Sequence, residues 1–284
     1  MNKAARCSMG WMAGGLLLAG LTACSGPALT PLQLQYQREE ERALRTYARG
    51  ELARALAAYQ ESLRWAEIAD DRPAMMAQAL NVGAVALALG DWALAERSFH
   101  RAQRLALTLS DPRGELQARL GLAQAGLRQG RFEIARRLFQ QALDDARDRD
   151  VAAVLVALNG LGLTQQELGQ TQAARAALAE AEPLARAHGD QRLLAATLTN
   201  RAALALRAGE VDQAEPYLEE AVELDRRTEN LPGLAHDLLL LARVRQHQGD
   251  ASAASALEQQ AHTIIQHTGQ YVGVNPYGRE KGFP

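Results

Sequence analysis

The sequence has little of the residue types that mark several protein classes. Aromatic residues make up 5% of its 284 positions, and Gly (23) and Pro (9) stay below the fraction that marks a disordered or fibrous chain. Two cysteines allow one disulfide at most. Basic and acidic side chains nearly balance, at 31 and 33, so there is no excess of cations to neutralise a phosphate backbone. The composition therefore predicts that nucleic acid is not a partner, and the abundance of alanine and leucine favours helix.

Long apolar runs are also missing. An uncharged stretch from Met9 to Leu21 follows the cations Lys3 and Arg6, and it is about 13 residues long. A helix that spans a bilayer needs about 20 apolar residues, so a permanent membrane helix is the less favoured interpretation of this stretch. The cationic start and the short apolar segment are instead typical of a secretory signal peptide.

The end of this segment, Leu21-Thr22-Ala23-Cys24, resembles the bacterial lipobox. That resemblance implies that residues 1–23 are removed, that Cys24 is acylated, and that residues 24–31 form a short tether. An ordinary cleavage site followed by an unmodified cysteine is the alternative. Because Cys7 leaves with the signal peptide and Cys24 is blocked, we expect no disulfide in the mature chain. Ser25 follows the cysteine where inner-membrane lipoproteins have Asp, which favours the outer membrane, with the protein facing the periplasm.

A repeat of about 40 residues fills the rest of the chain. A glycine recurs at intervals of 40, 40, 39, 40 and 40 residues, at Gly50, Gly90, Gly130, Gly169, Gly209 and Gly249. Alanine follows each glycine by five residues, at Ala55, Ala95, Ala135, Ala174, Ala214 and Ala254. The residue at plus nine is large, at Tyr59, Phe99, Phe139, Leu178 and Leu218, until Glu258 breaks the pattern; the residue at plus twelve is always small. Such regularity indicates one structural unit repeated six times.

Each unit is predicted to be two antiparallel helices. The glycine allows the first helix to end in a left-handed residue, and Asp-rich breaker segments such as Ser110-Asp111-Pro112 separate the units. Small residues allow the helices to approach closely, and the large residue at plus nine fills the gap between units. The predicted helices are 32–49, 51–69, 73–89, 91–109, 112–129, 131–148, 150–168, 170–188, 190–208, 210–228, 232–248 and 250–267.

The offsets of glycine, alanine, aromatic and alanine resemble those of the tetratricopeptide repeat, over residues 32–267. The usual repeat has 34 residues, so the 40-residue period is similar to its long-helix variety. HEAT repeats share the longer period, but their prolines inside the first helix are absent here. The resemblance implies an all-α fold, an α-solenoid of six antiparallel helix pairs. We expect the polar last helix, with Ser252, Ser255 and Glu258, to cap it. The Gly- and Pro-rich tail of residues 268–284 is expected to be disordered or to dock through its aromatics.

Sequence patterns that carry catalysis are missing. There is no glycine-rich phosphate loop, no His-Glu-x-x-His, no cysteine pair for zinc and no nucleophile elbow, and none of the six histidines stands four residues from another. We therefore expect no enzymatic activity, no metal site and no cofactor.

Binding is the remaining expectation. In tetratricopeptide folds the first helix of each pair lines a concave groove, which implies groove side chains two, three, six, nine, ten and thirteen residues before the turn glycine. Asn81 and Asn200 match positions where an amide holds a peptide backbone, because it donates and accepts together; local bridging between helices is the alternative. The arginines are candidates to bind carboxylates in two-point contacts. Exposed arginines that only keep the protein soluble are the alternative. The candidate groove residues are Tyr47, Asn81, Gln124, Arg128, Asn200, Arg207 and Arg243.

These observations predict a lipid-anchored scaffold of the outer membrane that binds proteins or peptides. Lipoproteins of this general build serve envelope assembly, secretion or the recruitment of peptidoglycan enzymes, and the sequence does not choose among these. The alternative is an accessory lipoprotein that binds a small ligand or a glycan. Because Tyr47 is the main aromatic residue at a groove position, the sequence favours a peptide over a glycan.

Overall fold

The computed structural model describes residues 29–268, which form twelve α-helices and no strand. Every predicted helix is present, with ends within two residues of the expected ones. The helices are α1 (Pro31–Ala48), α2 (Leu52–Ile68), α3 (Arg72–Leu89), α4 (Trp92–Leu109), α5 (Pro112–Arg128), α6 (Phe132–Ala146), α7 (Val151–Glu167), α8 (Thr171–His188), α9 (Gln191–Arg207), α10 (Val211–Arg227), α11 (Leu231–His247) and α12 (Ala251–Thr268).

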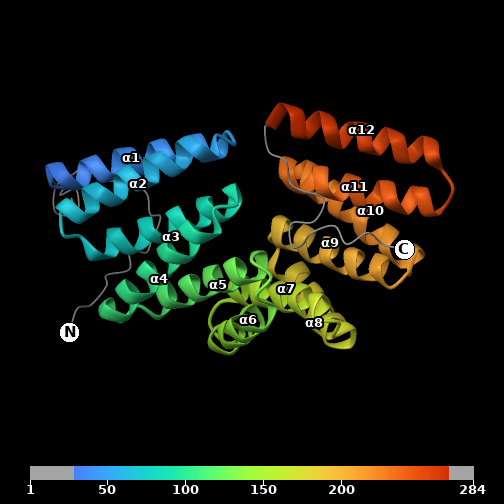
Figure 1. Ribbon diagram of the computed structural model, residues 1–284, viewed down its shortest axis with the longest axis horizontal. Coiled ribbons are helices and arrows are strands. Elements are labelled where there is room, and N and C mark those ends of the chain that lie inside the picture. The colour runs from blue at the N-terminus through green and yellow to red at the C-terminus, as the bar shows by residue number, and fades with distance from the viewer. Residues whose placement is uncertain (1–28, 269–284) are drawn as a thin grey trace, which may run out of the picture.

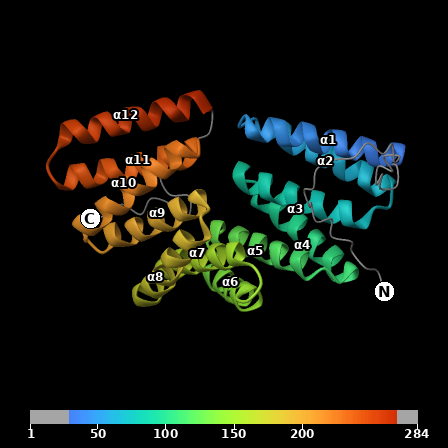
Figure 2. The same cartoon turned by 180° about the vertical axis from the view of Figure 1, so that it is seen from behind.

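Consecutive helices pack as antiparallel pairs, and the six pairs stack into a curved solenoid (Figure 1). The first two pairs form one arm, the last two form the other, and α5 to α8 join them. Figure 2 shows the same curve from behind. The predicted all-α solenoid is therefore confirmed.

The turns within each pair explain the regular glycine. All six recurring glycines adopt left-handed backbone angles, with φ between 74° and 82°, where a side chain would be strained. Between pairs, an acidic or amide side chain caps the next helix: Asp71 accepts from the Ala74 amide at 3.0 Å and Asp150 from the Ala153 amide at 3.0 Å. Each helix therefore starts and stops on signals that are present locally in the sequence.

The large residue at plus nine fills the space between pairs, as predicted. Phe99 is 4% exposed, and its ring occupies the volume that a Cβ would need on Gly83 of its own pair and on Gly121 of the next. Phe139 occupies the corresponding space at Gly160. The position nine residues before the turn glycine is thus a packing position as well as a groove position.

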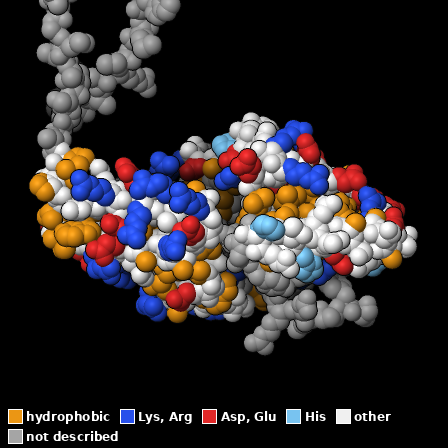
Figure 3. Space-filling view, turned by 90° about the horizontal axis from the view of Figure 1, so that it is seen from above, with side chains coloured by type: hydrophobic (Ala, Val, Ile, Leu, Met, Phe, Trp, Pro, Cys, Tyr) orange, Lys and Arg blue, Asp and Glu red, His pale blue; other side chains and the backbone are white. Residues whose placement is uncertain are grey.

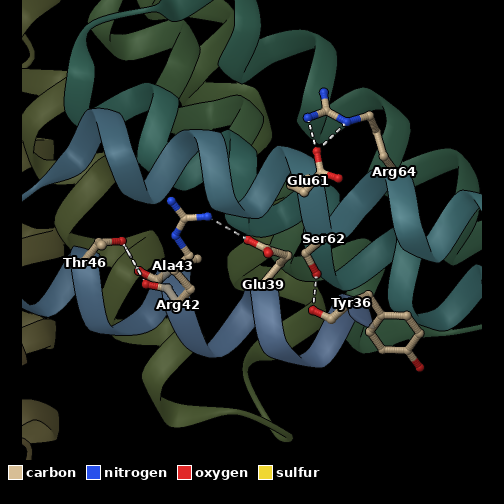
Figure 4. A network of polar contacts seen from close by, with 8 residues as sticks. All are labelled: Tyr36, Glu39, Arg42, Ala43, Thr46, Glu61, Ser62 and Arg64. Atoms are coloured by element: carbon tan, nitrogen blue, oxygen red, sulfur yellow. Dashed lines mark hydrogen bonds and ion pairs between the residues drawn. The ribbon is translucent and has the colours of Figure 1, made fainter. Parts of the chain in front are cut away.

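The outer face of the first described pair is polar. Positions fifteen, eleven and eight before the turn glycine hold Gln35, Glu39 and Arg42 in α1, whereas α11 has Leu234, Leu238 and Leu241 there, packed towards α10. Glu39 and Arg42 pair at 3.4 Å (Figure 4). Beneath them, the buried Ser62 hydroxyl donates to the Tyr36 carbonyl at 2.7 Å and ties α2 to α1.

The opposite end of the solenoid is polar as predicted. Ser252 and Ser255 of α12 are exposed, and Glu258 accepts a hydrogen bond from Gln246 of α11 at 2.9 Å. Within residues 29–268, both end faces of the stack therefore carry polar side chains, as the end of a solenoid requires.

None of the helices over residues 29–268 is long and apolar enough to cross a membrane. The predicted signal peptide, Cys24 and the tail after Thr268 lie outside the described residues.

Candidate binding groove

The first helices of the pairs line the inside of the curve. From α3 to α11, each odd-numbered helix contacts the next odd-numbered helix, whereas the even-numbered helices of neighbouring pairs make no comparable contact. Helices on the inside of a curved stack lie closer together than those on the outside, so the odd-numbered helices form the concave surface. Figure 3 looks from above at the opening of the curve and shows the hollow between the two arms.

The groove has an apolar section and a polar section. At its N-terminal end, Leu44 and Tyr47 of α1 are 53% and 48% exposed. Further along, Gln124 and Arg128 near the end of α5 and Arg243 of α11 are partly exposed. The structure therefore distributes the predicted groove residues over most of the solenoid.

Asn200 does not lie free in the groove. Its side chain is 9% exposed, and its amide donates to the Asn159 carboxamide oxygen at 3.1 Å. Asn159 in turn donates to the Thr197 hydroxyl at 2.9 Å. These bonds connect α7 to α9, so local bridging between helices, the alternative given for this position, describes Asn200. The physical reason is that this position faces the preceding pair.

Asn81 occupies the same position in the second pair but is partly exposed. Its amide donates to Gln78 within α3 at 3.3 Å, and Gln78 is 1% exposed. The carboxamide oxygen of Asn81 has no hydrogen bond to another described residue, so this asparagine keeps an acceptor available to a ligand.

Two of the predicted arginines, Arg207 and Arg243, differ in their surroundings. Arg207 pairs with Glu167 of α7 at 2.7 Å, and the Gln166 carboxamide, oriented so that both its polar ends are satisfied, accepts from the Arg207 Nε at 3.0 Å. Arg243 is partly exposed and has no carboxylate within 4 Å among residues 29–268. Arg207 is therefore neutralised by its neighbours, whereas the charge of Arg243 acts on His236 of the same helix.

His236 of α11 stands thirteen residues before Gly249, at one of the groove positions that the resemblance implied. Its Nδ1 atom is buried and makes no hydrogen bond to the residues that the structure describes. Burial, together with the positive charges of Arg243 and Arg128, lowers the pKa of His236 to about 4, so the ring is neutral at neutral pH. Because Arg128 belongs to α5, a charge of the third pair acts on a histidine of the sixth pair.

A buried carboxylate lies beside this histidine. Asp237 is 1% exposed, and its Oδ1 accepts from the Thr199 hydroxyl of α9 at 2.8 Å. Desolvation raises its pKa well above the usual range. No signal in the sequence distinguished Asp237 from an exposed acid, because its burial depends on how α11 packs on α9.

The described residues contain no group of three or more His, Cys, Asp or Glu side chains that could hold a metal ion. The chemistry of the groove is that of hydrogen bonds and charge.

The paired helices, the glycine turns and the concave surface agree with the comparison to known families. The tetratricopeptide-repeat family matches residues 75–148 and 193–267, more than half of the chain. The chain belongs to the tetratricopeptide-repeat family. Its solenoid is accordingly a scaffold for protein–protein interaction. No curated protein matches the sequence.

Solved structures share the solenoid at low sequence identity. A Rap protein complexed with competence and sporulation factor is similar with a TM-score of 0.67 and 14% identity, over 85% of this chain and 77% of that one. The Rap conjugation gene regulator of plasmid pLS20, in complex with the Phr* peptide, gives 0.65 and 13%, over 88% and 78%. BtubC from P. vanneervenii gives 0.56 and 20%, over 90% and 98%. At these identities the similarity concerns the fold.

Proposed function

We propose that this tetratricopeptide-repeat protein is a lipid-anchored scaffold that binds a peptide or an extended protein segment in its concave groove. The observation that carries the proposal is the combination of Asn81, Gln124, Arg128 and Arg243 on one continuous inner surface. An extended peptide presents a donor and an acceptor at each residue, and this surface offers amides and guanidinium groups that complement them. Two similar Rap structures were solved in complex with a factor and a peptide, which supports the same use here.

The anchor part of the proposal rests on the sequence. Leu21-Thr22-Ala23-Cys24 places an acylated cysteine about seven residues before α1, so the tether reaches roughly 20 Å from the membrane. We propose the periplasmic side of the outer membrane as the location, with partners in envelope assembly, secretion or peptidoglycan enzyme recruitment.

Site-specific photo-crosslinking in cells tests the groove. A photoreactive residue at Gln124, on the concave surface, should capture a defined protein segment, whereas the same residue at Gln141, exposed on α6, should not. Equal capture at both positions, or capture only at Gln141, would contradict groove binding. Adducts with glycan rather than protein would favour the alternative of a glycan-binding accessory protein.

Metabolic labelling with palmitate tests the anchor separately. The variant Cys24→Ala should lose the label and accumulate as an uncleaved or soluble species. If Cys24→Ala is labelled as strongly as the natural chain, the lipoprotein assignment is wrong.

A further inference from the structure

The N-terminal section of the groove exposes apolar side chains. Leu44 and Tyr47 lie one turn apart on α1, at groove positions six and three residues before the turn glycine, and they are 53% and 48% exposed. The leucine at the first of these positions in the fourth pair, Leu163, is 9% exposed. Neighbouring apolar side chains that are left exposed on a concave surface are typical of a contact site. Leu44 and Tyr47 are called the apolar patch below.

An acidic patch, Glu40 and Glu41, stands one turn further from the end of α1. These residues occupy the groove positions ten and nine residues before Gly50. Glu40 makes no ion pair with residues 29–268, and Glu41 pairs only with Arg45 of its own helix, at 3.7 Å, with side chains that are 68% and 63% exposed. An exposed pair of this kind contributes little to stability, so both carboxylates remain able to bind a cation.

The tail of residues 269–284 carries the complementary chemistry in the matching order. Tyr271 and Tyr277 come first, and the cations Arg279 and Lys281 follow, with one acid between them. In an extended chain, Tyr277 and Arg279 are about 7 Å apart, which is close to the spacing of about 5 to 6 Å between successive turns on a helix surface. A tyrosine on the apolar patch therefore places the cations at the acidic patch.

The tail also starts at the correct end of the groove. Figure 1 shows the end of α12 at the opening of the curve, across from the turn between α1 and α2. The 16 residues after Thr268, when extended, span about 50 Å, roughly twice the length of α1. A tail that enters the groove from this opening meets the apolar patch before the acidic patch.

We propose that residues 269–284 bind in cis in the N-terminal section of the groove, antiparallel to α1. The tyrosines of the tail contact the apolar patch, and Arg279 and Lys281 pair with the acidic patch. A partner then has to displace the tail before it can occupy this section. The inference rests on the proposed function, because it names an internal competitor for the same groove.

A labelled copy of the tail tests whether the groove is occupied. The probe is a fluorescein-labelled peptide with the sequence of residues 269–284, and its binding to the complete chain is measured by fluorescence anisotropy. The natural tail competes at an effective concentration in the millimolar range. The peptide should therefore bind the variant Tyr271→Ser/Tyr277→Ser at least tenfold more tightly than the natural chain. Equal binding to the two chains, or no binding to the variant, would overturn the proposal.

Matched leucine variants locate the contact. In the Tyr271→Ser/Tyr277→Ser background, Leu44→Ser should weaken peptide binding at least fivefold. Leu107→Ser, at a 58% exposed leucine near the end of α4 and outside the groove, should leave binding unchanged. Glu40→Gln should weaken binding at low salt and have no effect at high salt, because salt screens the attraction between Glu40 and the cations of the tail. Equal losses for Leu44→Ser and Leu107→Ser would mean that the tail does not bind at the apolar patch.

Photo-crosslinking separates binding in cis from binding between copies. A photoreactive residue in place of Tyr47 should form an adduct with residues 269–284 of the complete chain. In an equal mixture of isotopically heavy and light chains, each adduct should join two segments of the same isotope. Adducts of mixed isotope would show that the tail binds a second copy, and the assignment in cis would be overturned.

Capture at Gln124 reports on the proposed function independently. If the tail peptide does not bind and Gln124 still captures a protein segment, tail docking fails and groove binding by a partner stands. If the tail docks in cis and Gln124 captures nothing even in the Tyr271→Ser/Tyr277→Ser variant, the tail contact stands and the proposed function fails.

Discussion

Gly160 should be a position where a single methyl group destabilises the solenoid. A Cβ added there would lie 2.3, 2.4 and 2.7 Å from three ring atoms of Phe139, closer than real Cβ contacts allow. The ring has little freedom to move, because Phe139 is 1% exposed. Overpacking of this kind costs about 1 to 3 kcal/mol in the free energy of unfolding.

Gly126 provides the matched control. It also lies inside a first helix, but a Cβ there would have Ala135 Cβ at 3.6 Å, an ordinary contact. Replacing Gly by Ala inside a helix stabilises by about 1 kcal/mol, and this gain is common to both sites. Gly126→Ala should therefore be neutral or stabilised, and the difference between the two variants should equal the overpacking cost, about 1 to 3 kcal/mol.

Urea unfolding followed by far-ultraviolet circular dichroism measures the two stabilities. A double-mutant cycle with Phe139→Leu adds a second check. The loss of unfolding free energy caused by Phe139→Leu should be smaller in the Gly160→Ala background than in the natural chain, with a coupling energy between the two positions of about 1 kcal/mol or more. Equal stability of Gly160→Ala and Gly126→Ala, or a cycle without coupling, would refute the role given to the residue at plus nine.

Three further changes test the packing and the buried polar groups. Ala174 is fully buried, so Ala174→Leu should lower the melting temperature by an amount that corresponds to about 1 to 3 kcal/mol in the free energy of unfolding. Ala176 is exposed, so Ala176→Leu should have much less effect. Equal effects of the two changes would mean that the repeat register is wrong. Asn200→Ala should cost about 1 to 3 kcal/mol in thermal unfolding, because its partner amide is left buried, and Asn81→Ala should cost less; the reverse order would contradict the bridge between α7 and α9. Burial raises the pKa of Asp225 to about 6, so the folded chain binds this proton more tightly than the unfolded chain does. The contribution of Asp225 to the free energy of unfolding therefore falls as the pH rises from about 4 to about 6, by up to about 3 kcal/mol. Asp225→Asn should flatten that part of the pH profile of stability, and an unchanged slope would argue against a protonated buried carboxyl.

The sequence by itself determined the elements and their register. Gly90, Asp111 and the alanines at plus five act through local physics: a left-handed turn, a helix cap and a small volume at a crossing. Because each signal acts within a few residues and recurs every 40, the helix ends and the solenoid class could be predicted from the pattern alone. The polar cap at the last helix was readable for the same reason, since Glu258 departs from a position that is apolar in the other pairs.

Only the tertiary structure decided which groove positions remain available. Asn81 and Asn200 are equivalent in the repeat, yet Asn200 is bound to Asn159 of the preceding pair, because what faces a side chain across two pairs depends on both of them. Likewise, no local pattern relates Arg128 to His236, which are 108 positions apart in the chain. Their electrostatic contact arises from the curvature accumulated over three helix pairs, a property of how the pairs pack and not of any one repeat.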